Sequence, residues 1–216
     1  MLIDLKLDKK IVIVVGGGAE AYRKTQAFVD SGAKIWVISK DFSYGVQKLG
    51  EEKKVALLKT EIQNAKTFVE SLNPKPDVFL AVTNNPKLNL ELIKSAKSVE
   101  CLVYSVDNPA LSDFIFPAVA KVGDVKIAVS TGGKSPAMAR VLRQRIERLV
   151  TSDDLLEIEL QAKVRSILKD KVSDSKIRSK VLYEILNNDN IKQALRKGKL
   201  QEAEESALKL LKETKK

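Results

Sequence analysis

Residues 11–21, with the sequence IVIVVGGGAEA, decide the fold of this 216-residue chain. Ile11–Val15 is a continuous run of β-branched residues, which is typical of a strand buried on both faces. The residues after it match the pattern G-x-G-x-x-G/A, which predicts a tight turn into a helix. Gly16 would permit that turn, Gly18 would let a phosphate approach the backbone, and Ala21 would bring the helix close to the sheet. The unpaired N–H groups of the helix N-terminus would favour that anion.

The first half of the chain continues as alternating strands and helices. Further strands are expected over residues 34–38, 55–59, 77–82 and 102–106, with helices over residues 19–31 and from Pro86 onward. Alternation at this spacing predicts an α/β fold with a parallel, doubly wound, Rossmann-like sheet. We assign this dinucleotide-binding domain to residues 1–112.

The second half follows a different pattern. Residues 114–121 and 125–130 read as strands, and the three residues between them allow only an antiparallel hairpin. A helix over residues 136–150 follows, with an apolar stripe of Met138, Val141, Leu142, Ile146, Leu149 and Val150. We therefore expect a small α+β segment over residues 113–150. Residues 151–216 show only helical patterns, beginning with a cap at Ser152-Asp153, and predict a C-terminal helical domain.

Composition excludes several classes of chemistry. The chain has no histidine and one cysteine, Cys101, which rules out a Ser-His-Asp triad, a histidine-ligated zinc and a thiolate metal cage. Acid–base steps must therefore use Asp, Glu, Lys or Tyr, or a bound cofactor. No apolar run approaches about 18 residues, and the N-terminus alternates apolar and charged residues, unlike a signal peptide. We expect a cytoplasmic protein without a membrane partner or a resident metal.

The formal net charge is +10, with +3 in residues 1–112 and +7 in residues 113–216. The second half could therefore dock an anion, either nucleic acid or a polycarboxylate, or it could simply be a solvated lysine-rich surface. Aromatic residues make up only 5% of the chain, and no basic stripe is interleaved with them, so we expect no nucleic-acid partner.

An acidic residue follows the second strand, 20 residues after Ala21. Asp41 stands where a carboxylate binds the adenosine ribose of NAD, and its charge would repel the 2′-phosphate of NADP. Lys40 beside it could instead accept that phosphate. A plain strand-to-helix turn that binds no dinucleotide is the alternative.

Two polar loops follow later strands, Thr83–Pro86 and Ser105–Pro109. Ligands of such sheets bind outside the carboxyl ends of the strands, although Asn, Asp and Pro are also ordinary turn formers. Asp107 could accept a proton there, because an aspartate is ionised at neutral pH. Alternatively, its carboxylate only caps backbone N–H groups of an Asp-Asn-Pro turn.

An ordered set of motifs runs from about residue 5 to residue 150. It comprises VVGGG with Arg23-Lys24, AVTNNP with Asn89, SVDNP, FIFPA, and STGGKSP with Ala139-Arg140 and Arg143. Together these motifs resemble the precorrin-2 dehydrogenase family, whose module also forms the N-terminal part of siroheme synthase. Two departures are that Thr131 replaces a common Ser and that Lys40-Asp41 replaces a common Pro-Glu.

The resemblance implies NAD⁺-dependent oxidation of precorrin-2 to sirohydrochlorin, and some members of the family also insert Fe²⁺. It implies NAD contacts at Gly16, Gly18, Ala19, Glu20, Lys40, Asp41, Thr83 and Asn84, and a catalytic role for Asp107. It also implies a homodimer formed by the segment after the sheet. The apolar row Phe114-Ile115-Phe116, longer than one small sheet face can bury, supports that dimer.

Precorrin-2 carries eight carboxylates, which suits a basic second half of the chain. We expect its contacts at the loop and helix that follow the hairpin, namely Ser130, Thr131, Gly132, Gly133, Ser135, Arg140 and Arg143, since arginine binds carboxylates in a bidentate manner. A simple hairpin-to-helix turn is the alternative for this loop. A non-catalytic NAD-binding regulator would share the glycine loop and Asp41 but would need neither Asp107 nor the STGGKSP loop.

Overall fold

The structure is a computed structural model that describes residues 2–213. Its contacts divide the chain into two units, Met1–Phe116 and Pro117–Lys216. Among the described residues, no helix is both long enough and apolar enough to cross a membrane.

The first unit contains a parallel five-stranded sheet. Its strands are β1 (Ile11–Val15), β2 (Lys34–Ser39), β3 (Ala56–Lys59), β4 (Val78–Ala81) and β5 (Leu102–Ser105). Their order is β3-β2-β1-β4-β5, so the chain moves outward from β1 in one direction and then in the other. The prediction of a doubly wound, Rossmann-like sheet is confirmed. Ligands of such sheets bind at this reversal, beside the carboxyl ends of the strands.

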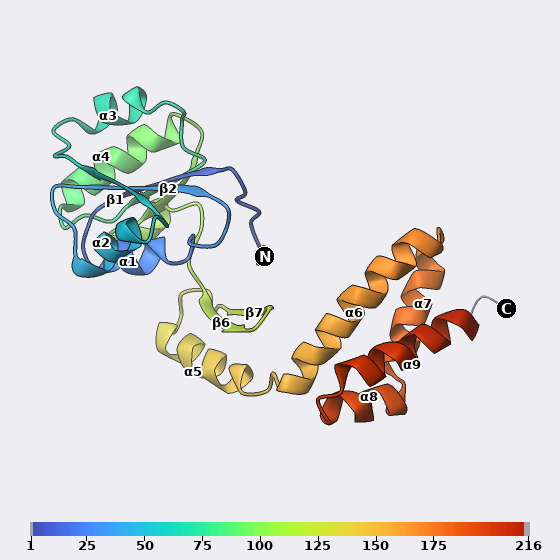
Figure 1. Ribbon diagram of the computed structural model, residues 1–216. Helices are drawn as coiled ribbons and strands as arrows, with labels where there is room; N and C mark the ends of the chain where they lie inside the picture. The colour runs from blue at the N-terminus through green and yellow to red at the C-terminus, as the bar shows by residue number, and fades with distance from the viewer. Residues whose placement is uncertain (1, 214–216) are drawn as a thin grey trace. The chain divides into compact units, whose positions relative to one another are not determined.

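Helices cover both faces of the sheet (Figure 1). One face carries α1 (Ala19–Thr25) and α2 (Tyr44–Glu51), and the other carries α3 (Ala65–Ser71) and α4 (Pro86–Lys97). Alternate residues of β1 supply the two cores, with Val12 and Val14 on the α1 side and Ile13 and Val15 on the α4 side. Burial on both faces explains why this strand is apolar throughout.

Helix α1 is shorter than the expected span of residues 19–31. After Thr25 the backbone hydrogen bonds change from i→i−4 to i→i−3, as in Phe28 N to Thr25 O at 2.9 Å. Asp30 and Gly32 then have φ of 67° and 78°, values that a right-handed helix cannot contain. Phe28 is buried all the same, because the turn still packs on the sheet.

The second unit begins with the expected hairpin and helix. Strands β6 (Ala118–Val122) and β7 (Val125–Val129) pair antiparallel, and α5 (Pro136–Glu147) follows. The first strand starts four residues later than expected, because Phe114 and Phe116 pack into the core of the first unit. Phe114 and Phe116 are thus partly covered within the first unit, and Ile115, which is 54% exposed, is the residue of this row that still supports the expected dimer.

Four helices complete the second unit: α6 (Ser152–Lys171), α7 (Ser175–Leu186), α8 (Asp189–Arg196) and α9 (Leu200–Glu213). Their core contains Leu160, Val164, Leu168, Val181, Ile185, Ile191, Leu195, Ala203 and Ala207. The N-cap of α6 is Thr151, one residue earlier than expected, in a capping box with Asp154. The further boundary at residue 151 stays a prediction.

Candidate functional site

The glycine loop joins β1 to α1 under tight steric limits. Gly16 has φ of +133°, and a Cβ on it would lie 2.5 Å from the carbonyl oxygen of Val82. A Cβ on Gly17 would lie 2.0 Å from the carbonyl oxygen of Asp41. Both positions therefore require glycine, because a side chain would collide with backbone from the ends of neighbouring segments.

Gly18 differs from the other two glycines. It is the N-cap of α1, no side chain caps that end, and a Cβ on it would meet nothing within 4 Å. The backbone N–H groups at the start of the helix therefore adjoin open space. This is the arrangement that a pyrophosphate requires, so the loop fits the dinucleotide that its pattern implies.

The first turn of α1 carries Ala19 and Glu20. The Glu20 carboxylate accepts two hydrogen bonds from Arg23, at 2.6 and 2.9 Å, and lies 3.7 Å from Lys24 Nζ. The hydrogen bond from Arg23 is the main reason why the pKa of Glu20 is lowered. Two cations of its own helix thus offset the negative charge of Glu20, which reduces its repulsion of an anion at the loop.

Lys40 and Asp41 follow the end of β2. Lys40 pairs with Glu61, and Asp41 pairs with Lys59 at 3.3 Å. The Asp41 side chain is 86% exposed, so water or a ligand hydroxyl can reach its carboxylate. Lys40 and Asp41 each have an ion-pair partner, and Asp41 is the more exposed of the two, at 86% against 66% for Lys40.

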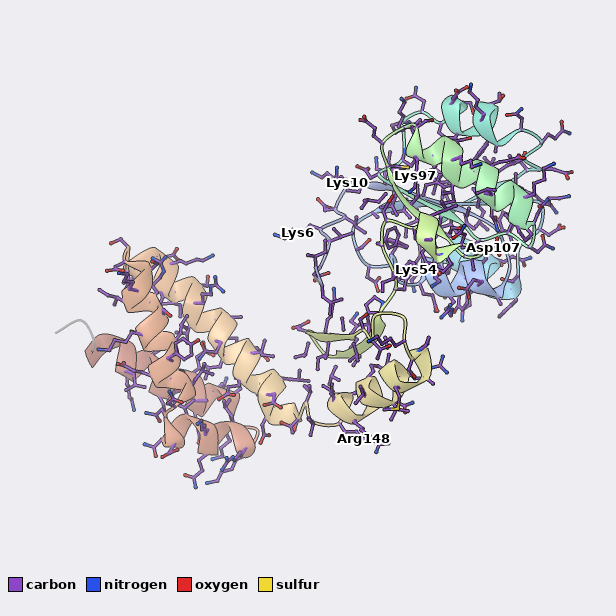
Figure 2. The ribbon with its side chains drawn as sticks, turned by 180° about the vertical axis from the view of Figure 1, so that it is seen from behind. Lys6, Lys10, Lys54, Lys97, Asp107 and Arg148 are labelled. Carbon is purple, nitrogen blue, oxygen red and sulfur yellow. The ribbon has the colours of Figure 1, made fainter. Side chains whose placement is uncertain are left out.

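Thr83 and Asn84 follow β4, and Asp107 follows β5. Because β4 and β5 are parallel neighbours, their carboxyl ends place these loops on one edge of the sheet. The Asp107 side chain is labelled in Figure 2. Its Oδ2 accepts a hydrogen bond of 2.5 Å from Nδ2 of Asn89, although Asp107 itself is exposed.

The turn after β5 does not depend on the Asp107 carboxylate. Ser105 Oγ accepts from the backbone N–H of Asn108 at 3.3 Å, and Ser112 Oγ accepts from that of Ser105 at 2.9 Å. Serine hydroxyls thus do the capping that the alternative interpretation gave to Asp107. The Asp107 carboxylate is left with a side-chain partner and an exposed position.

Three residues of this region were part of the quoted motifs but were given no role in the site, namely Gly17, Lys24 and Asn89. Lys24 is 6% exposed and Asn89 is fully buried. Each is a polar side chain at a helix position whose neighbours three or four residues away, such as Ala21 and Leu92, belong to the core. A polar residue at an apolar position of the helical period is the signal that could have identified both.

The expected substrate loop, residues 130–135, lies in the second unit and folds largely on itself. Thr131 Oγ1 accepts from the backbone N–H of Ser135 at 3.1 Å, and Ser130 Oγ accepts from that of Gly132 at 3.3 Å. Ser135 is the N-cap of α5 and accepts from Met138 N at 3.2 Å. These three hydroxyls therefore build the loop. Gly132 and Gly133, with φ of 60° and 80°, are exposed at its tip.

The two arginines of α5 differ in their surroundings. Arg143 is half-buried and pairs with Glu147 one turn later, whereas Arg140 is exposed and has no ion pair within the described residues. The expected apolar stripe is only partly covered in this unit, since Leu142, Ile146 and Val150 are half-buried. Met138 and Val141 of α5, and Leu149 beyond its end, are 45%, 36% and 73% exposed.

A surface hollow of about 770 Å³ lies along α6 in the second unit. Its lining includes Asp154, Arg165 and Lys169 of α6 and Leu182 of α7. None of the residues expected to bind cofactor or substrate lines it. The candidate site therefore stays at the carboxyl edge of the sheet and at the loop before α5.

Two family models match the chain. The family described as "Putative NAD(P)-binding" matches residues 3–118, and "Sirohaem biosynthesis protein central" matches residues 122–149. The first match spans the whole sheet, with the glycine loop and the loops that carry Asp41, Thr83 and Asp107. The second spans most of the hairpin and α5.

Named relatives agree with these models. A precorrin-2 dehydrogenase of Methanosarcina barkeri is 32% identical over 87% of this chain and 83% of its own length. Siroheme synthases of Hydrogenovibrio crunogenus and Pseudomonas paraeruginosa are both 30% identical, over 80% and 92% of this chain. The chain spans only 36% and 41% of the length of those two proteins.

A solved structure titled "SirC, precorrin-2 dehydrogenase" has the same fold. Its TM-score is 0.77, and the match covers 97% of this chain and 99% of that one. The sequence identity is 20%, so this likeness concerns the fold.

Proposed function

Because the chain belongs to the precorrin-2 dehydrogenase family, we propose that it oxidises precorrin-2 to sirohydrochlorin with NAD⁺ in siroheme biosynthesis. One observation carries the proposal beyond family membership. The Asp107 carboxylate stands on the same edge of the sheet as the glycine loop, and it is held by a buried amide rather than used in its own turn.

The cofactor is assigned to the edge formed by β2, β1 and β4. The backbone of Gly16, Gly18, Ala19 and Glu20 would hold the pyrophosphate, Asp41 the adenosine ribose, and Thr83 and Asn84 the half nearer the reaction. Lys40 would flank the ribose while paired with Glu61. When bound, NAD⁺ supplies the acceptor for the hydride that leaves the substrate.

Asp107 is assigned as the proton acceptor. Oxidation of precorrin-2 removes a hydride and a proton, and the proton needs a base. The chain has no histidine, and Asp107, at the carboxyl end of β5, is the carboxylate that would lie next to the nicotinamide. Its Oδ2 is hydrogen-bonded to Asn89, so Oδ1 would receive the proton.

The substrate carboxylates are assigned to the second unit. The exposed backbone of Gly132 and Gly133 at the start of α5 suits an anion, and the exposed guanidinium of Arg140 can form a bidentate pair with a carboxylate. Ser130, Thr131 and Ser135 shape the loop. Arg143 would bind a substrate carboxylate while it stays paired with Glu147.

We also place the protein as a cytoplasmic homodimer without a nucleic-acid partner. The support for the dimer is now the exposed apolar side chains of Val119, Met138, Val141 and Leu149, rather than Phe114 and Phe116. A single cysteine agrees with a reducing compartment. Insertion of Fe²⁺ stays a prediction of the resemblance, which an assay with sirohydrochlorin tests.

The direct test supplies purified protein with precorrin-2 and NAD⁺ and follows the ultraviolet absorbance of NADH. The proposal expects NADH to form in equal amount to sirohydrochlorin. A protein that binds NAD⁺ but forms no NADH from precorrin-2 would be the non-catalytic regulator instead. Asp107→Asn in the same assay separates catalysis by the site from any background oxidation.

A further inference from the structure

We infer that Asn89 is a positioning residue for the reaction, which holds the Asp107 carboxylate through Oδ2 and leaves Oδ1 open to act as the base. The inference rests on the proposed function of Asp107 as the base. It begins with the location of Asn89 in the first turns of α4, with its side chain fully buried between the loops after β4 and β5.

All the hydrogen-bonding capacity of the Asn89 amide is used. Its Oδ1 accepts from Thr83 N at 3.1 Å and from Thr83 Oγ1 at 2.7 Å. Its Nδ2 donates to Thr83 O at 3.0 Å and to Asp107 Oδ2 at 2.5 Å. An amide offers two acceptor positions and two donor hydrogens, so Asn89 has no capacity left for another partner.

The backbone of Thr83 sets the direction of this amide. A backbone N–H can only donate and a backbone carbonyl can only accept. If the amide were turned over, its NH₂ group would face the N–H of Thr83, and its oxygen would face the carbonyl of Thr83. Asn89 must therefore point an N–H group at Asp107, and this N–H engages Oδ2.

The same contact fixes the geometry of the base. The hydrogen bond to Asn89 holds Oδ2, and Oδ1 is the oxygen left without a hydrogen bond to the described residues. The start of α4 is itself held by its N-cap, since Asn85 accepts from Leu88 N at 3.1 Å. Thr83, Asn89 and Asp107 thus couple the loops after β4 and β5 through one buried side chain.

Sequence distance conceals this arrangement. Asn89 lies 18 residues before Asp107, and only the parallel pairing of β4 with β5 brings the two together. Asn89 would not touch the substrate or the cofactor, because it is fully buried. Its effect must therefore pass through Asp107 or through Thr83.

A double-mutant cycle tests the inference with Asn89→Ala, Asp107→Ala and the double variant. We expect Asn89→Ala to lower kcat by about 10- to 100-fold when Asp107 is present, as misplacement of a catalytic group does. In the Asp107→Ala background the same substitution should change kcat by less than about twofold, because nothing remains to be positioned. Asn188→Ala, which removes the N-cap of α8 in the second unit, is the control for loss of a half-buried asparagine hydrogen bond and should leave kcat unchanged.

Two further measurements separate positioning from general loss of structure. Asn89→Asp keeps the shape but sets a second carboxylate against Asp107, so the acid limb of log(kcat/KM) against pH should move to higher pH. In the free protein, the ¹⁵N-labelled side-chain amide of Asn89 should shift in the NMR spectrum as the pH is lowered, and this shift should disappear in Asp107→Ala. This readout needs neither cofactor nor turnover, and it applies even if Asn89→Ala folds poorly.

Different outcomes would overturn the role of Asn89 and the proposed oxidation of precorrin-2. An Asn89 effect of equal size with and without Asp107, or an Asn89 amide resonance indifferent to Asp107, overturns the inference and leaves the proposed function standing. Wild-type protein that forms no NADH from precorrin-2, or Asp107→Ala with normal kcat, overturns the proposed function or the proposed base.

Discussion

The ammonium group of Lys24 lies 4.2 Å from the centroid of the Phe116 ring, at the end of the first unit. The ring of Tyr104 flanks the same group at 4.5 Å, and the two rings meet edge to face with centroids 5.0 Å apart. Lys24 is 6% exposed, so its charge is stabilised by aromatic faces and by Glu20 instead of by water. Helix α1, which follows the glycine loop, thereby contacts the segment that contains Phe116 and follows the sheet.

This burial predicts a pH dependence of stability. Desolvation, and then the nearby charge of Arg23, lower the pKa of Lys24 below its ordinary value of 10.5. As the pH rises from the lowered pKa toward 10.5, Lys24 is still protonated in the unfolded chain but has lost its proton in the folded protein. The free energy of unfolding therefore increases over this range. Lys24→Met should abolish this increase in urea unfolding measured across that range. Lys66→Met, at an exposed lysine paired with Glu70, is the control and should retain it.

Asp41 should set the cofactor preference. We expect a higher kcat/KM with NAD⁺ than with NADP⁺, because the carboxylate of Asp41 would face the 2′-phosphate of NADP⁺. Like charges about 4 Å apart repel by about 1 kcal/mol in water, so Asp41→Asn should shift the preference toward NADP⁺ by about fivefold or more. Steady-state kinetics with both cofactors measure this ratio. Equal values in the wild type would mean that Lys40 meets the ribose instead.

Asp107→Asn should separate catalysis from structure. Asparagine can still accept the hydrogen bond from Asn89, and Ser105 and Ser112 hold the turn, so folding and NAD⁺ binding should be unchanged. Loss of the base should lower kcat by roughly 10²–10⁴-fold. Thermal unfolding and NAD⁺ titration serve as controls beside the rate. If kcat stayed within a few-fold of the wild type, the proton would leave to solvent.

The two arginines of α5 should not contribute equally to substrate binding. Arg140→Ala should raise KM for precorrin-2 by roughly tenfold with little change in kcat, since a charged hydrogen bond common to ground and transition states is lost. Arg143→Ala should raise KM less, because Arg143 already pairs with Glu147. Initial-rate kinetics on both variants give the comparison. The reverse order would show that Arg143 leaves Glu147 to bind the substrate.

The exposed apolar side chains of the hairpin and α5 predict a dimer. Val119 and Met138 are 50% and 45% exposed, and we expect a second copy of the chain to cover them. Light scattering at micromolar concentration should give twice the mass of one chain, and Val119→Lys with Met138→Lys should give the mass of one. A wild-type monomer at that concentration would exclude the dimer.

Much of the fold was accessible from local pattern. The β-branched run of Ile11–Val15, the glycines after it and the alternation of strands and helices predicted the parallel sheet, because each signal depends on residues a few positions apart. The three residues between the strands of the hairpin required an antiparallel turn for the same reason. The predicted length of α1 was wrong, because the change in hydrogen bonding after Thr25 has no strong local signal in the sequence.

The sequence by itself therefore determined the class of fold, the glycine loop and the family, all of which are properties of short ordered segments. Only the tertiary structure decided which distant side chains meet. It buried Lys24 among Tyr104 and Phe116, took Phe114 and Phe116 into the first core, and joined Asn89 to Asp107. The physical reason is that hydrophobic periodicity specifies which face of an element is buried. The order of strands in the sheet specifies which loops become neighbours, and with them the partner of each buried polar group.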